Sequence, residues 1–247
     1  MQAIILAGGK GTRMAGSPEG YALKSAALIH GKPLIEWQLA QLKQNGIDSV
    51  RIITSEFTPK GILEKYSRNE SQFGMRIEVE EQPFDKGSLG CIRDVLRGIP
   101  ANESVTVLYG DIFSDINLRA MLEQHQREGS LATLAKIKGD YVRFGMIEDD
   151  AKGRITGFKE KGSLQYNSGV AVVSGQLGWF LPDGKDFFAG IESLHRKGLN
   201  AFGSYTHEGF WWDVATTKEV DEINQAVDEG RINLETTSSS VSSEIKE

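Results

Sequence analysis

The sequence predicts an α/β fold with a mostly parallel central sheet, and three observations support this prediction. Gln2–Ala7 is a short continuous apolar run, as expected of a strand that is buried on both faces. Strand-like and helix-like segments alternate at least three times in the first 110 residues, which is typical of parallel strands joined by crossover helices. The chain has 247 residues, 39% of them hydrophobic, and this suffices for the substantial core that such a fold needs.

The first half of the chain is expected to supply the parallel strands. These strands are predicted at Gln2–Ala7, Val50–Thr54, Met75–Glu80 and Val105–Tyr109. A helix is predicted after Pro33, because apolar residues recur there at helical spacing and Gly46 follows the last of them. Two further helices are predicted at Thr58–Tyr66 and Gly87–Leu96.

After residue 117 the rhythm changes, and strands follow one another with little helix between them. The predicted strands are Leu131–Lys136, Val142–Ile147, Ile155–Lys159, Gly169–Val173 and Ala201–Tyr205. The predicted helices are Asn117–Arg127, Phe187–Arg196 and Thr216–Val227. We therefore expect a mixed or antiparallel extension of the same sheet.

Composition excludes several classes of protein. The single cysteine, Cys91, cannot form an internal disulfide or a C-x-x-C zinc site. A net charge of −6 argues against broad nucleic-acid binding, and no apolar run is long enough to span a bilayer. The first residues lack the basic and apolar regions of a signal peptide, so we expect a cytoplasmic protein.

One domain is predicted over residues 1–230, followed by a tail over residues 231–247. Seven of the eight residues in Thr236–Ser243 are Ser or Thr, a composition that cannot bury enough apolar surface to become ordered. The tail is therefore expected to be a disordered end, or else a linker to a further domain.

The first predicted strand runs into a glycine-rich segment, LAGGKGTR, at Leu6–Arg13. Glycines let backbone N–H groups approach a ligand closely, and Lys10 and Arg13 add positive charge suited to a phosphate. The dinucleotide fingerprint is incomplete because Met14 stands where its third glycine belongs, and there is no Walker pattern. A phosphate-binding loop and a purely structural turn both remain open on this evidence.

Two aspartates are candidate ligands of Mg²⁺. Asp111 follows the strand at Val105–Tyr109, where open α/β sheets bind their ligands, and Asp213 precedes the last predicted helix. The alternative is that each is a turn or helix-capping residue, with Thr216 or Thr217 competing for the second cap. Asp115 is a candidate cap for the helix that begins near Asn117.

Other side chains are expected to have structural roles. The histidines show no metal spacing and are predicted at surface or loop positions: His30, His125, His195 and His207. Cys91 is expected to be a small core residue, and at least one of Trp211 and Trp212 is expected to pack in the core. Lys136 and Lys138 are predicted to form a solvated strand end.

Six segments occur in an order that resembles one known family. They are LAGGKGTR, Lys24 ahead of GKPLIEWQL, YGD, FKEKG, YNSGV and WWDVATT. Together they resemble the sugar-phosphate nucleotidyltransferases, also called nucleotide-sugar pyrophosphorylases, from Met1 to about Val227. The chain looks like the compact members that lack a left-handed β-helix domain, and it looks most like the hexose- or heptose-1-phosphate guanylyltransferases. The resemblance implies a three-layer Rossmann-like fold whose mixed extension binds the sugar.

The resemblance also implies a reaction. A sugar 1-phosphate attacks the α-phosphate of a nucleoside triphosphate (NTP), which releases pyrophosphate and forms a nucleotide sugar. The implied cofactor is Mg²⁺, and the implied partners are the NTP and the sugar 1-phosphate, with no nucleic acid and no membrane. Whether the chain forms a homo-oligomer is left open. Because the nucleophile is already an anion, catalysis needs positioning and positive charge rather than a general base.

The resemblance assigns roles to individual residues. The residues implied to make the catalytic contacts with the phosphates are Arg13, Lys24 and Lys161. Nucleotide binding falls on Leu6, Ala7, Gly8, Gly9, Gly11, Thr12, Arg13, Gln82, Gly87 and Ser88. Sugar-phosphate binding falls on Gly110, Glu160, Lys161, Asn167 and Gly169. The metal ligands are Asp111 and Asp213.

This chain departs from the family pattern at two places. Leu23 stands before Lys24 where the family has proline, and the family's D-x-G-T-P near the end is DVATT here, with Asp213 in place. Two alternatives remain open: a cytidylyltransferase acting on phosphocholine or an inositol phosphate, and a non-catalytic domain that binds a nucleotide sugar. The sequence leaves the base and the sugar open, with guanine slightly favoured.

Overall fold

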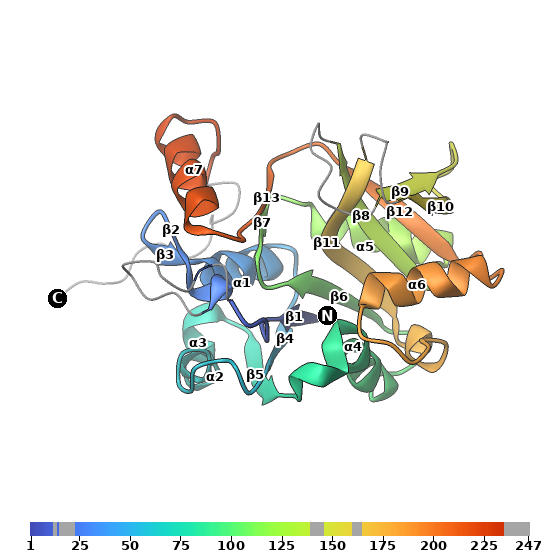
Figure 1. Ribbon diagram of the computed structural model, residues 1–247, viewed down its shortest axis with the longest axis horizontal. Helices are drawn as coiled ribbons and strands as arrows, with labels where there is room; N and C mark the ends of the chain where they lie inside the picture. The colour runs from blue at the N-terminus through green and yellow to red at the C-terminus, as the bar shows by residue number, and fades with distance from the viewer. Residues whose placement is uncertain (12–13, 15–22, 139–145, 160–164, 235–247) are drawn as a thin grey trace.

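The computed structural model describes residues 1–11, 14, 23–138, 146–159 and 165–234, and its centre is a seven-stranded sheet (Figure 1). The strand order is β12-β8-β11-β6-β1-β4-β5. In chain order these strands are β1 (Gln2–Leu6), β4 (Ser49–Thr54), β5 (Arg76–Glu81), β6 (Ser104–Tyr109), β8 (Ala132–Lys138), β11 (Gln165–Ser174) and β12 (Phe202–His207).

The first half of the chain forms the parallel part of the sheet, as predicted. β1 lies between β4 and β6 and is parallel to both, and β5 adds in parallel at the edge. Ile4 and Ile5 of β1 are almost wholly buried on opposite faces, which explains its continuous apolar run.

The second half extends this sheet, which confirms the predicted mixed extension. β11 runs antiparallel to both β6 and β8, whereas β12 is parallel to β8. Three two-stranded sheets accompany it among the described residues: β9 (Met146–Asp149) with β10 (Ile155–Lys159), β7 (Ile112–Ser114) with β13 (Trp211–Asp213), and β2 (Leu28–Ile29) with β3 (Lys32–Pro33). The β7–β13 pair was not predicted, because strands of three residues are too short to show an alternating pattern.

Helices cover both faces of the sheet and complete a three-layer α/β fold. In chain order the helices are α1 (Leu34–Gln44), α2 (Glu64–Arg68), α3 (Glu70–Phe73), α4 (Gly87–Arg97), α5 (Leu118–Glu128), α6 (Phe187–Arg196) and α7 (Thr217–Asp228). Apolar side chains of α1, α2, α3 and α5 pack on one face, and those of α4 and α6 on the other. Helix α7 instead packs beside the β2–β3 hairpin (Figure 1). No helix in the described part of the chain is long and apolar enough to cross a membrane.

The bounds of two predicted elements are wrong. The strand predicted at Gly169–Val173 is β11, which spans Gln165–Ser174. The helix predicted at Thr58–Tyr66 begins only at Glu64, because Thr58 closes a turn with Ser55 and Gly61 has a positive φ of 84°. The packed chain also continues past residue 230, since Ile232 is 5% exposed against α7 and its neighbours. Residues 235–247 of the predicted tail, and most of the strand predicted at Val142–Ile147, lie outside the described residues.

The expected cap at Asp115 is also wrong. The Asn117 side chain caps α5 by accepting a hydrogen bond from the Ala120 N–H at 2.9 Å. Asp115 instead lies 3.1 Å from Nε2 of His207, a histidine that is 7% exposed rather than on the surface.

Two more side chains expected at the surface are buried. Lys136 is 6% exposed and is paired with Asp149, which also accepts a hydrogen bond from Ser204. His125 is 3% exposed on the inner side of α5. Cys91 is in the core, as expected.

His125 is expected to make folding stability depend on pH. Its Nδ1 lies 3.0 Å from the Thr133 hydroxyl, and burial lowers its pKa to about 4. Because the unfolded chain binds this proton near pH 6.5, stability should be lost as pH falls from about 6.5 to about 4. The loss should reach roughly 2–3 kcal/mol between pH 7 and pH 4.5. Urea denaturation at these two pH values should show a smaller loss for His125→Gln, and parallel losses in variant and wild type would contradict the prediction.

Candidate functional site

A cavity of about 540 Å³ opens at the carboxyl ends of β1, β4, β5 and β6. This is the edge at which open α/β sheets bind ligands. The predicted site residues that line it are Leu6, Ala7, Gly8, Gly9, Gly11, Lys24, Gln82, Gly87, Ser88, Gly110 and Asp111. Thr12, Arg13, Glu160 and Lys161 lie outside the described residues.

The glycine-rich loop after β1 needs its glycines for different reasons. A Cβ at Gly8 would lie 3.1 Å from the backbone of Thr54, and Gly11 has a positive φ of 60°. A Cβ at Gly9 would meet no atom of the described residues within 4 Å. The described part of the chain therefore gives no steric reason for glycine at position 9.

Gly9→Ala is expected to leave the fold intact and weaken triphosphate binding. The added methyl group enters open space, so the melting temperature should stay within about 2 °C of wild type. The same methyl group should hold a phosphate away from the loop N–H groups and weaken NTP binding about tenfold, the effect of losing one good hydrogen bond to a charged group. Calorimetric titration with an NTP measures this, and unchanged affinity would remove Gly9 from the phosphate site.

Lys24 and Asp111 form an ion pair inside the cavity. Nζ of Lys24 lies 2.5 Å from Oδ2 of Asp111, and the two side chains are 19% and 25% exposed. The neighbours of Lys24 hold it there, since Leu23 and Ser25 are 3% and 1% exposed. Leu23 thus anchors this segment in the core at the position where the family has proline.

The β7–β13 pair brings Asp213 beside Asp111. Asp213 is opposite Ile112 in the antiparallel register, and the Val214 N–H donates to the Asp111 carbonyl at 2.8 Å. Asp213 does not cap α7, whose N-cap position is held by Thr216. Asp213 is therefore not the cap of α7; it lies beside the backbone of Asp111 and is not among the residues that line the cavity.

The donor set at this point fits Mg²⁺. Mg²⁺ in phosphate-transfer sites is typically held by one or two carboxylates together with waters and substrate phosphates. Within the described ranges, no group of three or more His, Cys, Asp and Glu side chains gathers in a way that could hold a metal ion. Two carboxylates without a full protein cage match an ion that is shared with a phosphate.

The first turn of α4 is built around Gly87 and Lys185. The carbonyl of Lys185 accepts hydrogen bonds from the Leu89 N–H at 3.1 Å and from the Ser88 hydroxyl at 3.3 Å. The Ser88 hydroxyl also accepts from the Phe187 N–H at 3.0 Å. Ser88 therefore lines the cavity, but its side chain is used to hold the loop before α6.

Asn167 and Gly169 shape a bulge in β11, at the same edge of the sheet. The Asn167 side-chain oxygen accepts a hydrogen bond from the Gly169 N–H at 3.0 Å, and Gly169 has a positive φ of 76°. The register of β11 against β8 shifts between Asn167 and Ala171. Gly110 is needed for close packing, because a Cβ there would lie 2.8 Å from the Leu6 carbonyl oxygen. The predicted sugar positions thus have clear backbone roles.

Several lining residues were missed by sequence reasoning. Ser55 donates a hydrogen bond to the Gly8 carbonyl at 2.7 Å, and its place directly after β4 could have indicated it. Phe84 was also missed; its ring and that of Phe57 lie under Lys10, whose Nζ is 4.8 and 4.5 Å from their centroids. Lys185 lies in the loop before α6, about a hundred residues along the chain from Ser88, which it contacts, and no sequence signal indicates it.

Comparison with known proteins assigns the chain to a family. Residues 2–230 match the family model for nucleotidyl transferases. The chain belongs to this family. The predicted resemblance to the sugar-phosphate nucleotidyltransferases is thereby confirmed, and the named relatives include guanylyltransferases acting on mannose and heptose 1-phosphates.

Three relatives show how broad the likeness is. A UTP–glucose-1-phosphate uridylyltransferase of Synechocystis is 27% identical over 77% of this chain and 53% of its own length. A probable glucose-1-phosphate cytidylyltransferase of Bacillus subtilis is 30% identical over 94% of this chain and 98% of its own. A D-glycero-α-D-manno-heptose 1-phosphate guanylyltransferase of Campylobacter jejuni is 32% identical over 65% of this chain and 69% of its own.

A solved structure confirms the fold class. A putative glucose-1-phosphate thymidylyltransferase of Bacillus anthracis superposes with a TM-score of 0.76 over 94% of this chain and 96% of its own, at 22% identity. Likeness at that identity concerns the fold alone. The chain spans about half the length of the Synechocystis relative and nearly all of the Bacillus subtilis one.

Proposed function

We propose that this protein transfers a nucleoside monophosphate from an NTP to a hexose or heptose 1-phosphate, with release of pyrophosphate. The observation that carries the proposal is one cavity in which the Lys24–Asp111 ion pair lies beside the glycine-rich loop. A loop of backbone N–H groups suits a triphosphate, and a neighbouring cation suits the α-phosphate where charge develops.

The predicted site residues would divide the work between positioning and charge. The loop at Gly8–Gly11 would hold the triphosphate, and Lys24 would approach the α-phosphate. Asn167 and Gly169, at the same edge of the sheet, would hold the sugar, together with Glu160 and Lys161. Arg13 would neutralise the leaving pyrophosphate. A sugar phosphate needs no general base, so these contacts account for the rate by alignment and charge.

Asp111 and Asp213 would hold Mg²⁺. When bound, Mg²⁺ would offset the charge of the phosphate oxygens and help to orient the triphosphate. Lys24 pairs with Asp111, so its ammonium group lies at the same end of the cavity as these ligands.

We favour GTP as the donor, and the heptose guanylyltransferase of Campylobacter jejuni supports this choice. The second candidate is cytidylyl transfer, favoured by the likeness to the probable cytidylyltransferase of Bacillus subtilis over nearly the whole length of both chains. Its acceptor would be a sugar 1-phosphate, phosphocholine or an inositol phosphate.

Pyrophosphate release is the test of this function. The protein is incubated with each of the four NTPs or dTTP as the donor. The acceptors are hexose and heptose 1-phosphates, phosphocholine and inositol 1-phosphate, and each pair is tested with and without Mg²⁺. We expect turnover with a sugar 1-phosphate, with GTP as the best donor, and only with the metal. No turnover in any combination would contradict the proposal. Nucleotide-sugar binding without turnover would instead support a non-catalytic binding domain.

A further inference from the structure

Gln82 is a buried polar side chain at the end of the cavity farthest from Asp111. It follows β5, whereas Asp111 follows β6, and β1 and β4 lie between these two strands. Three strand spacings separate β5 from β6 by about 14 Å, the span of a nucleotide from phosphate to base. If the proposed function holds and phosphates occupy the Lys24 end, the base lies near Gln82.

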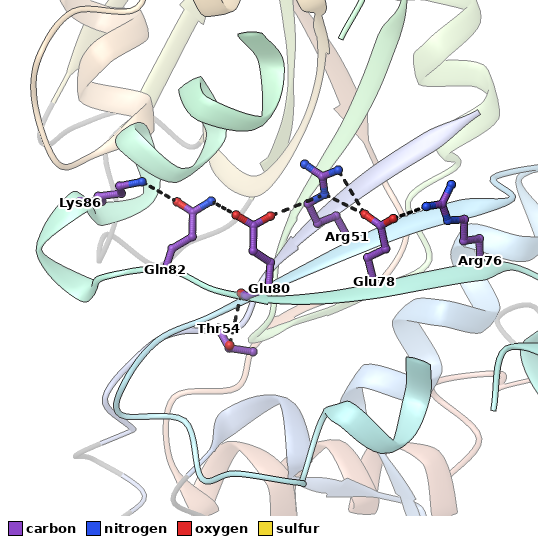
Figure 2. A network of polar contacts seen from close by, with 7 residues as sticks. All are labelled: Arg51, Thr54, Arg76, Glu78, Glu80, Gln82 and Lys86. Carbon is purple, nitrogen blue, oxygen red and sulfur yellow. Dashed lines mark hydrogen bonds and ion pairs between the residues drawn. The ribbon is translucent and has the colours of Figure 1, made fainter. Parts of the chain in front are cut away.

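The Gln82 amide is held from both sides. Its Nε2 donates to Glu80 Oε1 at 2.6 Å, and its Oε1 accepts from Lys86 Nζ at 3.3 Å. Figure 2 shows these contacts as the start of a row of side chains that continues through Arg51 to Glu78 and Arg76. The Gln82 side chain is 5% exposed, so water does not compete with these partners on most sides.

The chemistry of the two partners decides which way the amide points. A carboxylate only accepts hydrogen bonds and an ammonium group only donates them. The amide nitrogen must therefore face Glu80 and the amide oxygen must face Lys86. Lys86 is kept charged by Asp94, 2.6 Å away, whose hydrogen bond raises the pKa of the ammonium group. A flipped amide would set like groups against each other at both ends.

We propose that Glu80 and Lys86 are positioning residues that fix the polarity of the Gln82 amide, and that this polarity selects one class of base. After these contacts, the amide still has one hydrogen on Nε2 and one lone pair on Oε1 to offer a ligand. Guanine, uracil and thymine present a carbonyl oxygen next to a ring N–H. Adenine and cytosine present an amino group next to a ring nitrogen acceptor, which is the reverse pattern. For a base held in one orientation, a fixed amide matches one of these patterns and opposes the other.

The test is the base preference of variants that release the amide. Glu80→Gln keeps the size of the side chain, but its amide both donates and accepts, so this partner no longer dictates the direction of the Gln82 amide. Lys86→Met removes the donor at the other end. Glu78→Gln is the matched control, because it removes the same charge from the same face of β5 without touching Gln82. Dissociation constants for GTP, UTP, ATP and CTP are measured by calorimetry in the presence of Mg²⁺.

Wild type should bind GTP and UTP, which have keto bases, at least about tenfold more tightly than ATP and CTP, which have amino bases. One good pair of hydrogen bonds to a base edge gives about this much discrimination. The combined variant Glu80→Gln/Lys86→Met should bring this ratio close to one, and each single variant should lower it only in part because the other partner still directs the amide. Glu78→Gln should leave the ratio unchanged. A wild type without such a preference, or a combined variant that keeps it, would overturn the inference.

Measuring binding and turnover separately distinguishes failure of this inference from failure of the proposed function. Loss of pyrophosphate release from wild type contradicts the proposed function, while the ratio of dissociation constants still decides the role of Glu80 and Lys86. A chain that binds no NTP contradicts both.

Discussion

Asp111→Asn is expected to lower kcat at least a hundredfold while the protein remains folded. Asparagine keeps the shape of the side chain but loses the charge that pairs with Lys24 and that would hold Mg²⁺. Loss of one preorganised charge contact to the reacting phosphates costs about 3–4 kcal/mol of transition-state stabilisation. Steady-state pyrophosphate release and thermal unfolding of the same preparation measure the two parts of this prediction.

Asp115→Asn is the matched control for this variant. It neutralises a carboxylate four residues further on, which pairs with His207 rather than with Lys24. We expect a lower melting temperature and an unchanged kcat. If Asp111→Asn keeps full activity with the Mg²⁺ dependence of wild type, Asp111 is not part of the metal site.

Gly87→Ala is expected to destabilise the protein by about 2–4 kcal/mol, the combined cost of backbone strain and steric overlap. Gly87 has a φ of 63°, and a Cβ there would lie 2.1 Å from the Lys185 carbonyl oxygen. Either the loop at Lys185 or the start of α4 must shift, and both line the cavity. Thermal unfolding should show a decrease of roughly 5–15 °C, and NTP affinity should fall with it.

Gly61→Ala separates the two causes of this loss. Gly61 also has a positive φ, 84°, but its Cβ would meet no protein atom within 4 Å. The variant should therefore lose only the conformational part, about 1 kcal/mol. Equal losses in the two variants would show that contact with Lys185 contributes nothing.

Local sequence patterns were sufficient to predict those strands and helices whose formation depends only on residues close by in the chain. β1 is a largely apolar run because both of its faces are buried, and β1, β4 and β6 were each predicted to within one residue. Helix α6 was predicted at Phe187–Arg196 and observed there. The glycine-rich loop and Asp111 were found by the same local reasoning, because both follow buried strands directly.

Local patterns failed where a distant segment changes a residue's surroundings. His125 and Lys136 carry polar side chains that usually face water, yet Thr133 and Asp149 satisfy them inside the protein. Asp115 resembles a helix cap in sequence, but His207 from the end of β12 lies beside it. Each error comes from a partner more than seven residues away.

The sequence by itself determined the order of the main strands and helices, the glycine-rich loop and the identity of the charged groups near it, because these depend on neighbours along the chain. The tertiary structure decided which of those groups meet. Asp213 reaches Asp111 only because β13 pairs with β7 across about a hundred residues of chain. The Gln82 amide has a fixed direction only because α4 and its preceding turn place Lys86 opposite Glu80. Hydrogen bonds act over about 3 Å, so their partners are set by folding in space and not by spacing in sequence.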